Sequence, residues 1–198
     1  MSATATASDI RLTVPNGWWC VDPSAPDPDL ARWVAERVAE RSAVQPDPRV
    51  EAVLSTDWMR LLRAARAAGA VLYAGGWAMA EGGAKPLVSA SCLVSPVPES
   101  SQDPDTGGRD GKGSRDRDRD TILSEEIELP AGRVIHTVAL SPIPSPQGDL
   151  AALDITYVFV DSAPQWSLRF TTPSIRHARD LAVVFHGVAR SVRLGAAG

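Results

Sequence analysis

Hydrophobic and polar residues alternate in the first strand-like stretch of the chain. In Ile10–Val14 every second residue is apolar, which is the pattern of a strand with one buried face. Turn residues occupy positions 15–17, and Trp18–Val21 continues as a short second strand. The pattern therefore predicts a hairpin near the start of the chain.

The spacing of apolar residues then becomes helical. Prolines between residues 22 and 28 indicate an extended connector, and Asp27-Pro28 offers an N-cap with proline at the first helical position. Apolar residues follow at i, i+3, i+4 and i+8, which predicts a helix through about residue 41. These residues are Leu30, Trp33, Val34 and Val38.

A second and longer helix is predicted between residues 49 and 68, with a possible break at Ser55–Asp57. Gly69 provides a C-terminal stop, because glycine adopts the left-handed conformation freely. The predicted buried stripe of the second half of this helix consists of Trp58, Leu61, Leu62 and Ala65.

Strand-like segments follow these helices. Residues 70–79 and 87–94 predict a hairpin across the turn-rich stretch 81–86. The pair Gly75-Gly76 lies inside the first of these strands, where it indicates a bulge or a close approach to the backbone. A phosphate-binding loop is the alternative interpretation, but the pair lacks both the G-x-G-x-x-G spacing and a following helix.

Two further strand pairs are predicted, at 122–129 with 133–141 and at 153–160 with 166–172. A four-residue turn at 162–165 would set Tyr157 opposite Phe170 and Phe159 opposite Leu168. Both faces of this closing hairpin are apolar, which implies a sheet that is covered on both sides.

The chain closes with a predicted amphipathic helix between Pro173 and Leu194, capped by Ser174. Its apolar side is predicted to consist of Ile175, Ala178, Leu181, Ala182, Phe185, Ala189 and Val192. The expected fold is α+β: an α/β/α sandwich with a mostly antiparallel sheet, the N-terminal helices on one face and the C-terminal helix on the other.

Residues 99–120 differ in kind from the rest of the chain. They contain no large apolar side chain and are rich in Gly, Ser and Asp. Such a segment cannot bury enough surface to offset its chain entropy, so we expect a disordered loop. An insertion within one domain spanning residues 1–198 is favoured over a linker between two domains, because neither side alone makes a complete sheet.

Composition and charge exclude several classes of protein. A net charge of −4 argues against nucleic acid or an anionic membrane as the default partner. Arginine accounts for 18 of the 20 basic residues, which is typical of GC-rich actinobacterial genomes and therefore weak evidence for phosphate binding. The chain shows no secretory signal and no apolar run long enough to span a bilayer, so a cytoplasmic protein without membrane insertion is expected.

The residue types that usually carry chemistry are scattered. His136 shares a strand face with apolar residues and is expected to be a half-buried, satisfied histidine, whereas His177 and His186 are expected to face water. Cys20 and Cys92 form no CxxC pair and are predicted to be free thiols, buried or half-buried. No metal-ligand spacing, cofactor loop or nucleophile elbow is present, so no catalytic residue, metal or cofactor is predicted.

Two features suggest a partner-binding surface. In the pair Trp18-Trp19, one ring should enter the core and the other should point away, where it would either anchor a partner or lie under an N-terminal helix. The second helix carries a basic patch on its outer side, which would either grip an acidic protein or simply be solvated. This patch consists of Arg60, Arg63 and Arg66.

The order of elements and three local motifs together resemble the PsbP/Mog-like superfamily. The motifs are the early Pro15-Asn-Gly-Trp18 turn, the late segment Trp166–Pro173 that enters the last helix, and Ser191-Val-Arg193 near the end of that helix. The resemblance covers nearly all of the chain except residues 99–120. Its members are mostly non-catalytic adaptors, lipoproteins or accessory subunits. This chain departs from the lipoprotein members in lacking an export signal, and it carries extra sequence at 28–69.

The expected function is therefore that of a non-catalytic accessory or adaptor protein of a bacterial assembly, with a protein partner. The alternative is a small-molecule or lipid carrier with a pocket between the sheet and the N-terminal helices, where Trp33, Trp58 and Trp77 would meet. A third hypothesis is a hydrolase or transferase that uses Cys20 or His136.

Overall fold

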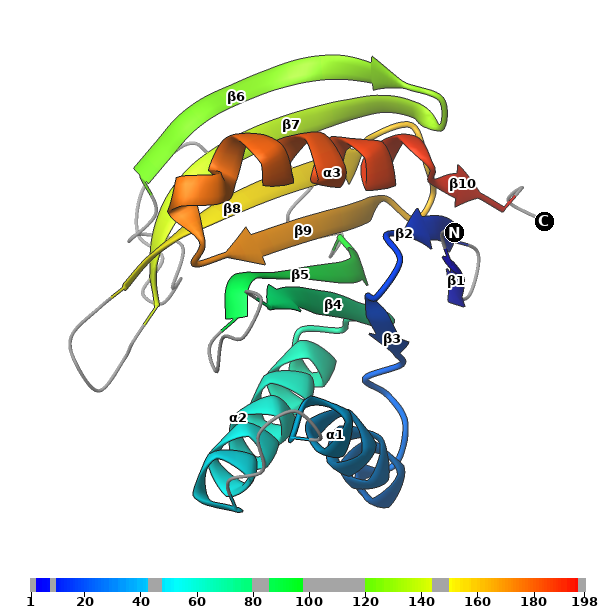
Figure 1. Cartoon of the computed structure of the whole chain (residues 1–198). Helices are drawn as coiled ribbons and strands as arrows, with labels where there is room; N and C mark the ends of the chain where they lie inside the picture. The colour runs from blue at the N-terminus through cyan, green and yellow to red at the C-terminus, as the bar shows by residue number, and fades with distance from the viewer. Residues whose placement is uncertain are drawn as a thin grey trace, which may run out of the picture.

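Seven strands form one antiparallel sheet in the described part of the computed structural model (Figure 1). They are Trp19–Val21 (β3), Leu72–Met79 (β4), Pro86–Pro96 (β5), Asp120–Leu129 (β6), Gly132–Ile143 (β7), Leu150–Phe159 (β8) and Trp166–Thr172 (β9). Their order across the sheet is β3-β4-β5-β9-β8-β7-β6. The structure describes residues 3–7, 10–42, 48–79, 86–97, 120–143 and 150–195.

A smaller sheet lies at one end of the molecule, close to both described chain ends (Figure 1). Its strands are Ala3–Ala7 (β1), Ile10–Val14 (β2) and Arg193–Leu194 (β10), with β2 in the middle. The sequence predicted β2 as half of a hairpin with residues 18–21, and this pairing is wrong. Its apolar residues Ile10, Leu12 and Val14 are all buried, and β2 takes its hydrogen-bond partners from the two ends of the chain.

The helices lie on opposite faces of the large sheet, as the sequence predicted. Asp27–Ser42 (α1) and Pro48–Ala67 (α2) pack beside β3 and β4, while Ala178–Arg190 (α3) crosses the other face over β8 and β9 (Figure 1). A short 3-10 helix, Ile175–His177 (η3), precedes α3. The α+β sandwich expected from the sequence is therefore confirmed.

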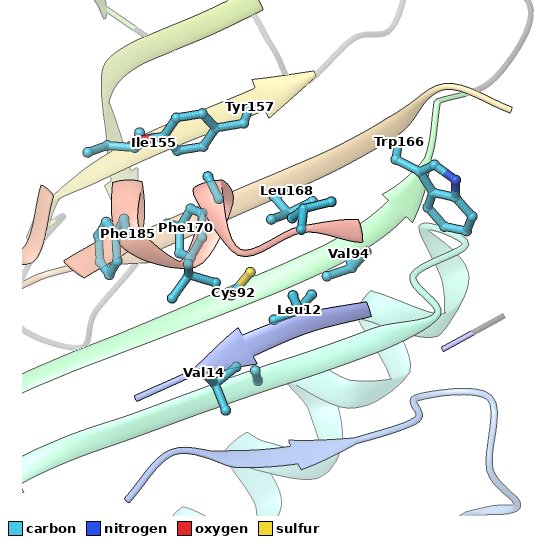
Figure 2. Packing of buried hydrophobic residues seen from close by; sticks show 14 of the residues in the cluster. Leu12, Val14, Cys92, Val94, Ile155, Tyr157, Trp166, Leu168, Phe170 and Phe185 are labelled. Carbon is cyan, nitrogen blue, oxygen red and sulfur yellow. The ribbon is translucent and has the colours of Figure 1, made fainter. Parts of the chain in front are cut away.

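The main core lies between α3 and the sheet. Strand alternation points Cys92, Leu168, Phe170, Ile155 and Tyr157 to the same face, as the strand register requires (Figure 2). Phe185 of α3 is fully buried against them, and its ring stacks on that of Phe170 with 4.7 Å between centroids. This aromatic pair anchors the helix to the sheet.

The second core is smaller and covers only one end of the opposite face. It consists of Leu30, Val34, Val38, Leu62 and Tyr73. The strand residues that join it, Val21 and Leu93, come from β3 and β5. Beyond these strands the same face becomes polar, with Asp154 accepting hydrogen bonds from Arg169 and Ser141, each at 2.7 Å. The N-terminal helices thus cover the β3 end of the sheet.

The register of the closing hairpin differs from the prediction by two residues. Tyr157 faces Leu168 and Phe159 faces Trp166, because the connection runs from Val160 to Gln165 and is longer than a four-residue turn. A shift of two residues keeps each side chain on its predicted face of the sheet and changes only its neighbours across the strands.

The helices differ from the sequence pattern in their buried stripes and at both ends of the last helix. Helix α2 continues through Ser55–Asp57 without a break, and Leu61 is 42% exposed, so it does not belong to the buried stripe. Helix α3 begins only at Ala178, and Ser174 makes no side-chain capping hydrogen bond. The helix ends at Arg190, and Leu194, its predicted end, lies in strand β10. Ile175, predicted on the apolar side, precedes α3 and is 41% exposed. The predicted stop at Gly69 is confirmed, with a positive φ of 72°.

The predicted disordered loop 99–120 lies outside the described residues except for Asp120, which begins β6. The predicted turn at 81–86 also lies outside them except for Pro86, the first residue of β5.

Candidate functional site

A groove of about 610 Å³ runs between α3 and the strands β7 and β8. Its lining is almost entirely apolar, with two histidines, a tyrosine and an arginine among the side chains. The lining residues are His136, Val138, Leu153, Ile155, Tyr157, Ala178, Arg179, Ala182, Val183 and His186. A volume of this size matches the pockets that bind small organic molecules in proteins, roughly 300 to 1,000 Å³.

The groove arises from unequal side-chain sizes on the two flanks of α3. On one flank Leu181, Phe185 and Val188 fill the space against the sheet and are buried. On the other flank Ala178 and Ala182 stand one turn apart and face β7 and β8. Because alanine is too short to reach the sheet, this side stays hollow.

The floor of the groove carries a cluster of aromatic rings. The His136 ring stacks on Tyr157 with 4.8 Å between centroids, and His186 of α3 lies 6.1 Å from the same tyrosine. His136 Nδ1 is 3.1 Å from a carboxylate oxygen of Glu125 on β6. The prediction of a half-buried, satisfied His136 is therefore confirmed, and the ring cluster connects β6, β7, β8 and α3.

Tyr157 lies on the floor of the groove and is almost fully buried as a residue. It is 1% exposed, and within the described residues its hydroxyl makes no hydrogen bond with the protein. Figure 2 shows it beside Ile155 on the same face of β8, and both side chains line the groove. Burial raises the pKa of Tyr157 to about 12, so the hydroxyl keeps its proton and remains a hydrogen-bond donor at neutral pH.

The electrostatic surroundings of His186 are positive. Its pKa lies below the ordinary value because of burial and because Arg190 and His136 repel a second positive charge. Arg179, one helical turn from Val183, is exposed and makes no ion pair within the described part of the chain. Arg179 and His186 border the groove from positions two helical turns apart on α3.

The predicted roles of the other histidines are wrong. His186 lines the groove and does not face open water, and His177 is half-buried with its Nε2 atom enclosed and lacking a hydrogen-bond partner in the described structure. The signal was present in the sequence, because Ala178, Ala182 and His186 repeat at i, i+4 and i+8 along one flank of the helix. Its meaning depended on which strands that flank faces.

The two adjacent tryptophans point to different parts of the molecule. Trp18 packs edge-on against Phe185 of α3, with ring centroids 6.3 Å apart. Trp19 packs edge-on against Trp58 of α2 at 5.7 Å. Both are half-buried, which agrees with the interpretation that the second ring lies under an N-terminal helix.

The predicted basic patch is partly a structural feature. Arg63 and Arg66 donate to the two carboxylate oxygens of Asp27 at 2.7 and 2.9 Å, and Arg66 also donates to the Pro23 carbonyl at 2.7 Å. These hydrogen bonds lower the pKa of Asp27 and tie α2 to the start of α1. Arg60 is exposed and pairs within its own helix. A partner-binding role for these residues stays a prediction.

The space that the carrier hypothesis assigned to a pocket holds stacked rings. Trp33 and Trp58 lie 5.5 Å apart in a stacked arrangement between α1 and α2. The groove beside α3 lies on the opposite face of the sheet. The Trp77 side chain lies outside the described residues.

Both cysteines are free thiols, as predicted. Cys20 on β3 and Cys92 on β5 both lie opposite Ala74 of β4 in the strand register. Strand β4 therefore lies between the two thiols. Burial raises the pKa of both thiols, which disfavours the thiolate that nucleophilic catalysis needs. Within the described residues no three His, Cys, Asp or Glu side chains gather as metal ligands, and no helix is both long and apolar enough to cross a membrane.

No protein-family model matches the chain, and neither does any curated protein. Among solved structures, the chain is similar to the solution structure of cyanobacterial PsbP (CyanoP) from Synechocystis sp. PCC 6803. The match has a TM-score of 0.47 and 11% sequence identity, and it covers 98% of this chain and 91% of that one. The resemblance to the PsbP/Mog-like superfamily stays a prediction from the sequence motifs.

Proposed function

We propose that the chain is a non-catalytic binding protein and that the groove beside α3 holds a small, largely apolar ligand. The observation that carries this proposal is a hollow of about 610 Å³ with apolar side chains on both its floor and its helical wall. The groove is open to solvent, so its apolar lining is in contact with water. A ligand would remove that apolar surface from water, which is favourable.

The exposure of the helical wall supports the same conclusion. Val183 is 71% exposed although it stands on the flank of α3 that borders the groove. A ligand seated against Ala182 would cover this side chain and remove its apolar surface from water, which is favourable. The neighbouring Val184 is 37% exposed and does not line the groove.

These two valines provide a matched pair of variants. Nile red, a neutral apolar dye, should bind the wild-type protein with saturable fluorescence enhancement. Val183→Asp should weaken binding about tenfold or more, because it places a carboxylate at the apolar wall. Val184→Asp carries the same charge on the same helix and should bind the dye as the wild type does. Absence of saturable binding, or equal losses in both variants, would refute the proposal.

A protein partner is the second candidate function, and the edge of the sheet favours it. Within the described residues β6 pairs only with β7, so its other side is open. Ile122 and Leu123 on this strand are 62% and 41% exposed. An open edge with apolar side chains can accept a strand from another polypeptide.

This second candidate requires its own test. A pull-down from native lysate should recover one stoichiometric protein with the wild-type chain, and Ile122→Lys should abolish recovery. Val184→Lys, on the remote helix face, serves as the matched control for the added charge. Loss of the partner in both variants, or in neither, would speak against recognition through β6.

A further inference from the structure

We infer that the outer face of α3 docks the protein on an anionic membrane surface. This inference goes beyond the proposed function, and it does not require the groove to hold a ligand. Helix α3 lies on the outside of the large sheet (Figure 1), so this face is turned away from the core. The outer face, which includes the turn before the helix, consists of seven exposed residues: Arg176, Arg179, Asp180, Val183, Val184, Gly187 and Arg190.

Helical geometry places the arginines of this face in one row. Arg179 and Arg190 are 11 residues apart, which is close to three full turns of an α-helix, so both lie on the same side. Val183 stands between them on that side, one turn after Arg179. At 1.5 Å per residue the two arginines are separated by about 16 Å along the helix. A row of charges of this length suits an extended anionic surface better than one small anion.

The arginines of the outer face are not neutralised by acids of the protein. On α1 the exposed Arg32 donates to Asp29 at 2.6 Å, whereas the three arginines of the outer face make no ion pair within the described part of the chain. Asp180 is the only acid among the seven residues, so the face carries two net positive charges although the whole chain carries −4. Because salt screens charges over about 10 Å, this local charge decides what the face attracts.

Apolar side chains in the middle of the row favour a membrane over a nucleic acid. Val183 is 71% exposed, more than any other large hydrophobic residue that the structure describes, and Val184 is 37% exposed. Helices that lie on membranes combine basic residues with apolar ones that enter the boundary between headgroups and acyl chains. Phosphates along a nucleic acid would offer the valines no such contact. The larger apolar side of α3 is buried in the core, so the contact with the bilayer is peripheral.

The size of the outer face favours a membrane over a protein partner. A stable protein interface buries roughly 800 Å² on each partner. The 13 residues of α3 offer a footprint of about 20 Å by 10 Å, which is several times smaller. The face also borders the groove at Arg179 and Val183, which both line it. Docking on a bilayer would therefore bring the open side of the groove next to the lipid.

Vesicle flotation of the full chain tests this inference. Vesicles of equal parts phosphatidylglycerol and phosphatidylcholine should bind the protein, vesicles of phosphatidylcholine alone should not, and added salt should weaken the binding. Arg176→Gln combined with Arg190→Gln should weaken it about twenty-five-fold, because each basic residue near an anionic surface contributes about fivefold. Neither arginine lines the groove. The matched control, Arg32→Gln combined with Arg60→Gln, removes the same charge from exposed positions of α1 and α2 and should bind as the wild type does.

Two single substitutions separate docking from folding and from the binding of the dye. Asp180→Asn removes the only acid of the outer face and should strengthen vesicle binding about fivefold, and its unfolding transition checks that the variant folds. Val184→Asp, which should bind Nile red as the wild type does, should weaken vesicle binding about tenfold, because it places a carboxylate against anionic headgroups.

The outcomes of these experiments are independent of those of the dye assay. Equal binding to both kinds of vesicle, equal losses in the two double variants, or weaker binding by Asp180→Asn would overturn the membrane inference and leave the groove proposal standing. Binding to polyglutamate or to a DNA duplex without binding to the vesicles would overturn it as well, and would identify an acidic polymer as the partner of this face.

Discussion

A side chain at Gly76 in β4 should destabilise the protein, because the ring of Trp18 lies too close to the position of a Cβ atom. A Cβ built on Gly76 lies 2.7 Å from Trp18 Cδ1 and 3.2 Å from its Nε1. The glycine pair that the sequence analysis associated with a bulge or a close approach is thus a close approach, of an indole ring onto the strand. The alternative of a phosphate-binding loop finds no support, since both glycines are buried inside a strand.

The cost of Gly76→Ala follows from the geometry. Ordinary contact begins at 3.4 Å, so the ring must retreat by 3.4 − 2.7 = 0.7 Å. Phe185 of α3 packs edge-on against that ring and is itself fully buried, so the displacement is passed to the helix. Overpacking of this kind costs about 1 to 3 kcal/mol, offset by about 0.5 to 1 kcal/mol because alanine restricts the unfolded chain. We expect a net loss of about 1 to 2 kcal/mol.

Urea denaturation followed by tryptophan fluorescence measures this change, and Tm should fall by roughly 2 to 8 °C for a chain of this size. Gly187→Ala is the control: the added methyl group meets nothing within 4 Å, and it replaces a glycine inside α3. This variant should gain about 0.5 to 1 kcal/mol. In a Trp18→Ala background the penalty at Gly76 should vanish. Equal effects of the two glycine substitutions, or a penalty that persists without the indole ring, would refute the reasoning.

Three further predictions concern the polar and thiol groups. Burial alone would raise the pKa of Asp154, but hydrogen bonds, chiefly from Arg169, outweigh it and the pKa lies below its ordinary value. The stability that Asp154 contributes is present above about pH 4, the unfolded pKa, and is lost as the pH falls through the lower folded pKa. In urea titrations Asp154→Asn should lower the free energy of unfolding by about 2 kcal/mol at pH 7. Its free energy of unfolding should also fall less steeply than that of the wild type as the pH is lowered. Arg66→Ala should lower Tm and Arg60→Ala should not, because only the former ties α2 to α1; equal Tm values would contradict this. Cys92 should react with a maleimide only after the protein unfolds, because its side chain is 0% exposed. Mass spectrometry of labelled peptides measures this reaction, and rapid labelling of Cys92 in the native protein would disprove its burial.

Most of the local structure could be predicted from the order of apolar residues. The stripe of α1, Leu30, Val34 and Val38, is buried as its spacing predicts, and so are Leu181 and Phe185 of α3. The expectation of helices on both faces came from the two apolar faces of the β8–β9 hairpin, but α1 and α2 cover the β3 end of the sheet and not this hairpin. The helix stripes were predicted because the period of a pattern reports which side of an element is buried, and burial is the largest favourable term in folding.

The sequence pattern could not identify which elements meet. The register of β8 and β9 was wrong by two residues because either register buries the same faces. Strand β2 was assigned to its neighbour along the chain, although it pairs with β1 and with β10 from the opposite chain end. In both cases the alternation of apolar and polar residues in a strand does not specify which strand it pairs with, or in which register.

The sequence by itself determined the fold class, the burial of α3 and the half-buried state of His136. Only the tertiary structure decided that His136, Tyr157, His186 and Arg179 come together around one hollow. These four residues belong to β7, β8 and α3, and the space between them exists because two alanines face that side of the sheet. Such a groove depends on the combined volume of side chains from separate elements. The pattern of residues within a single element does not specify that combined volume.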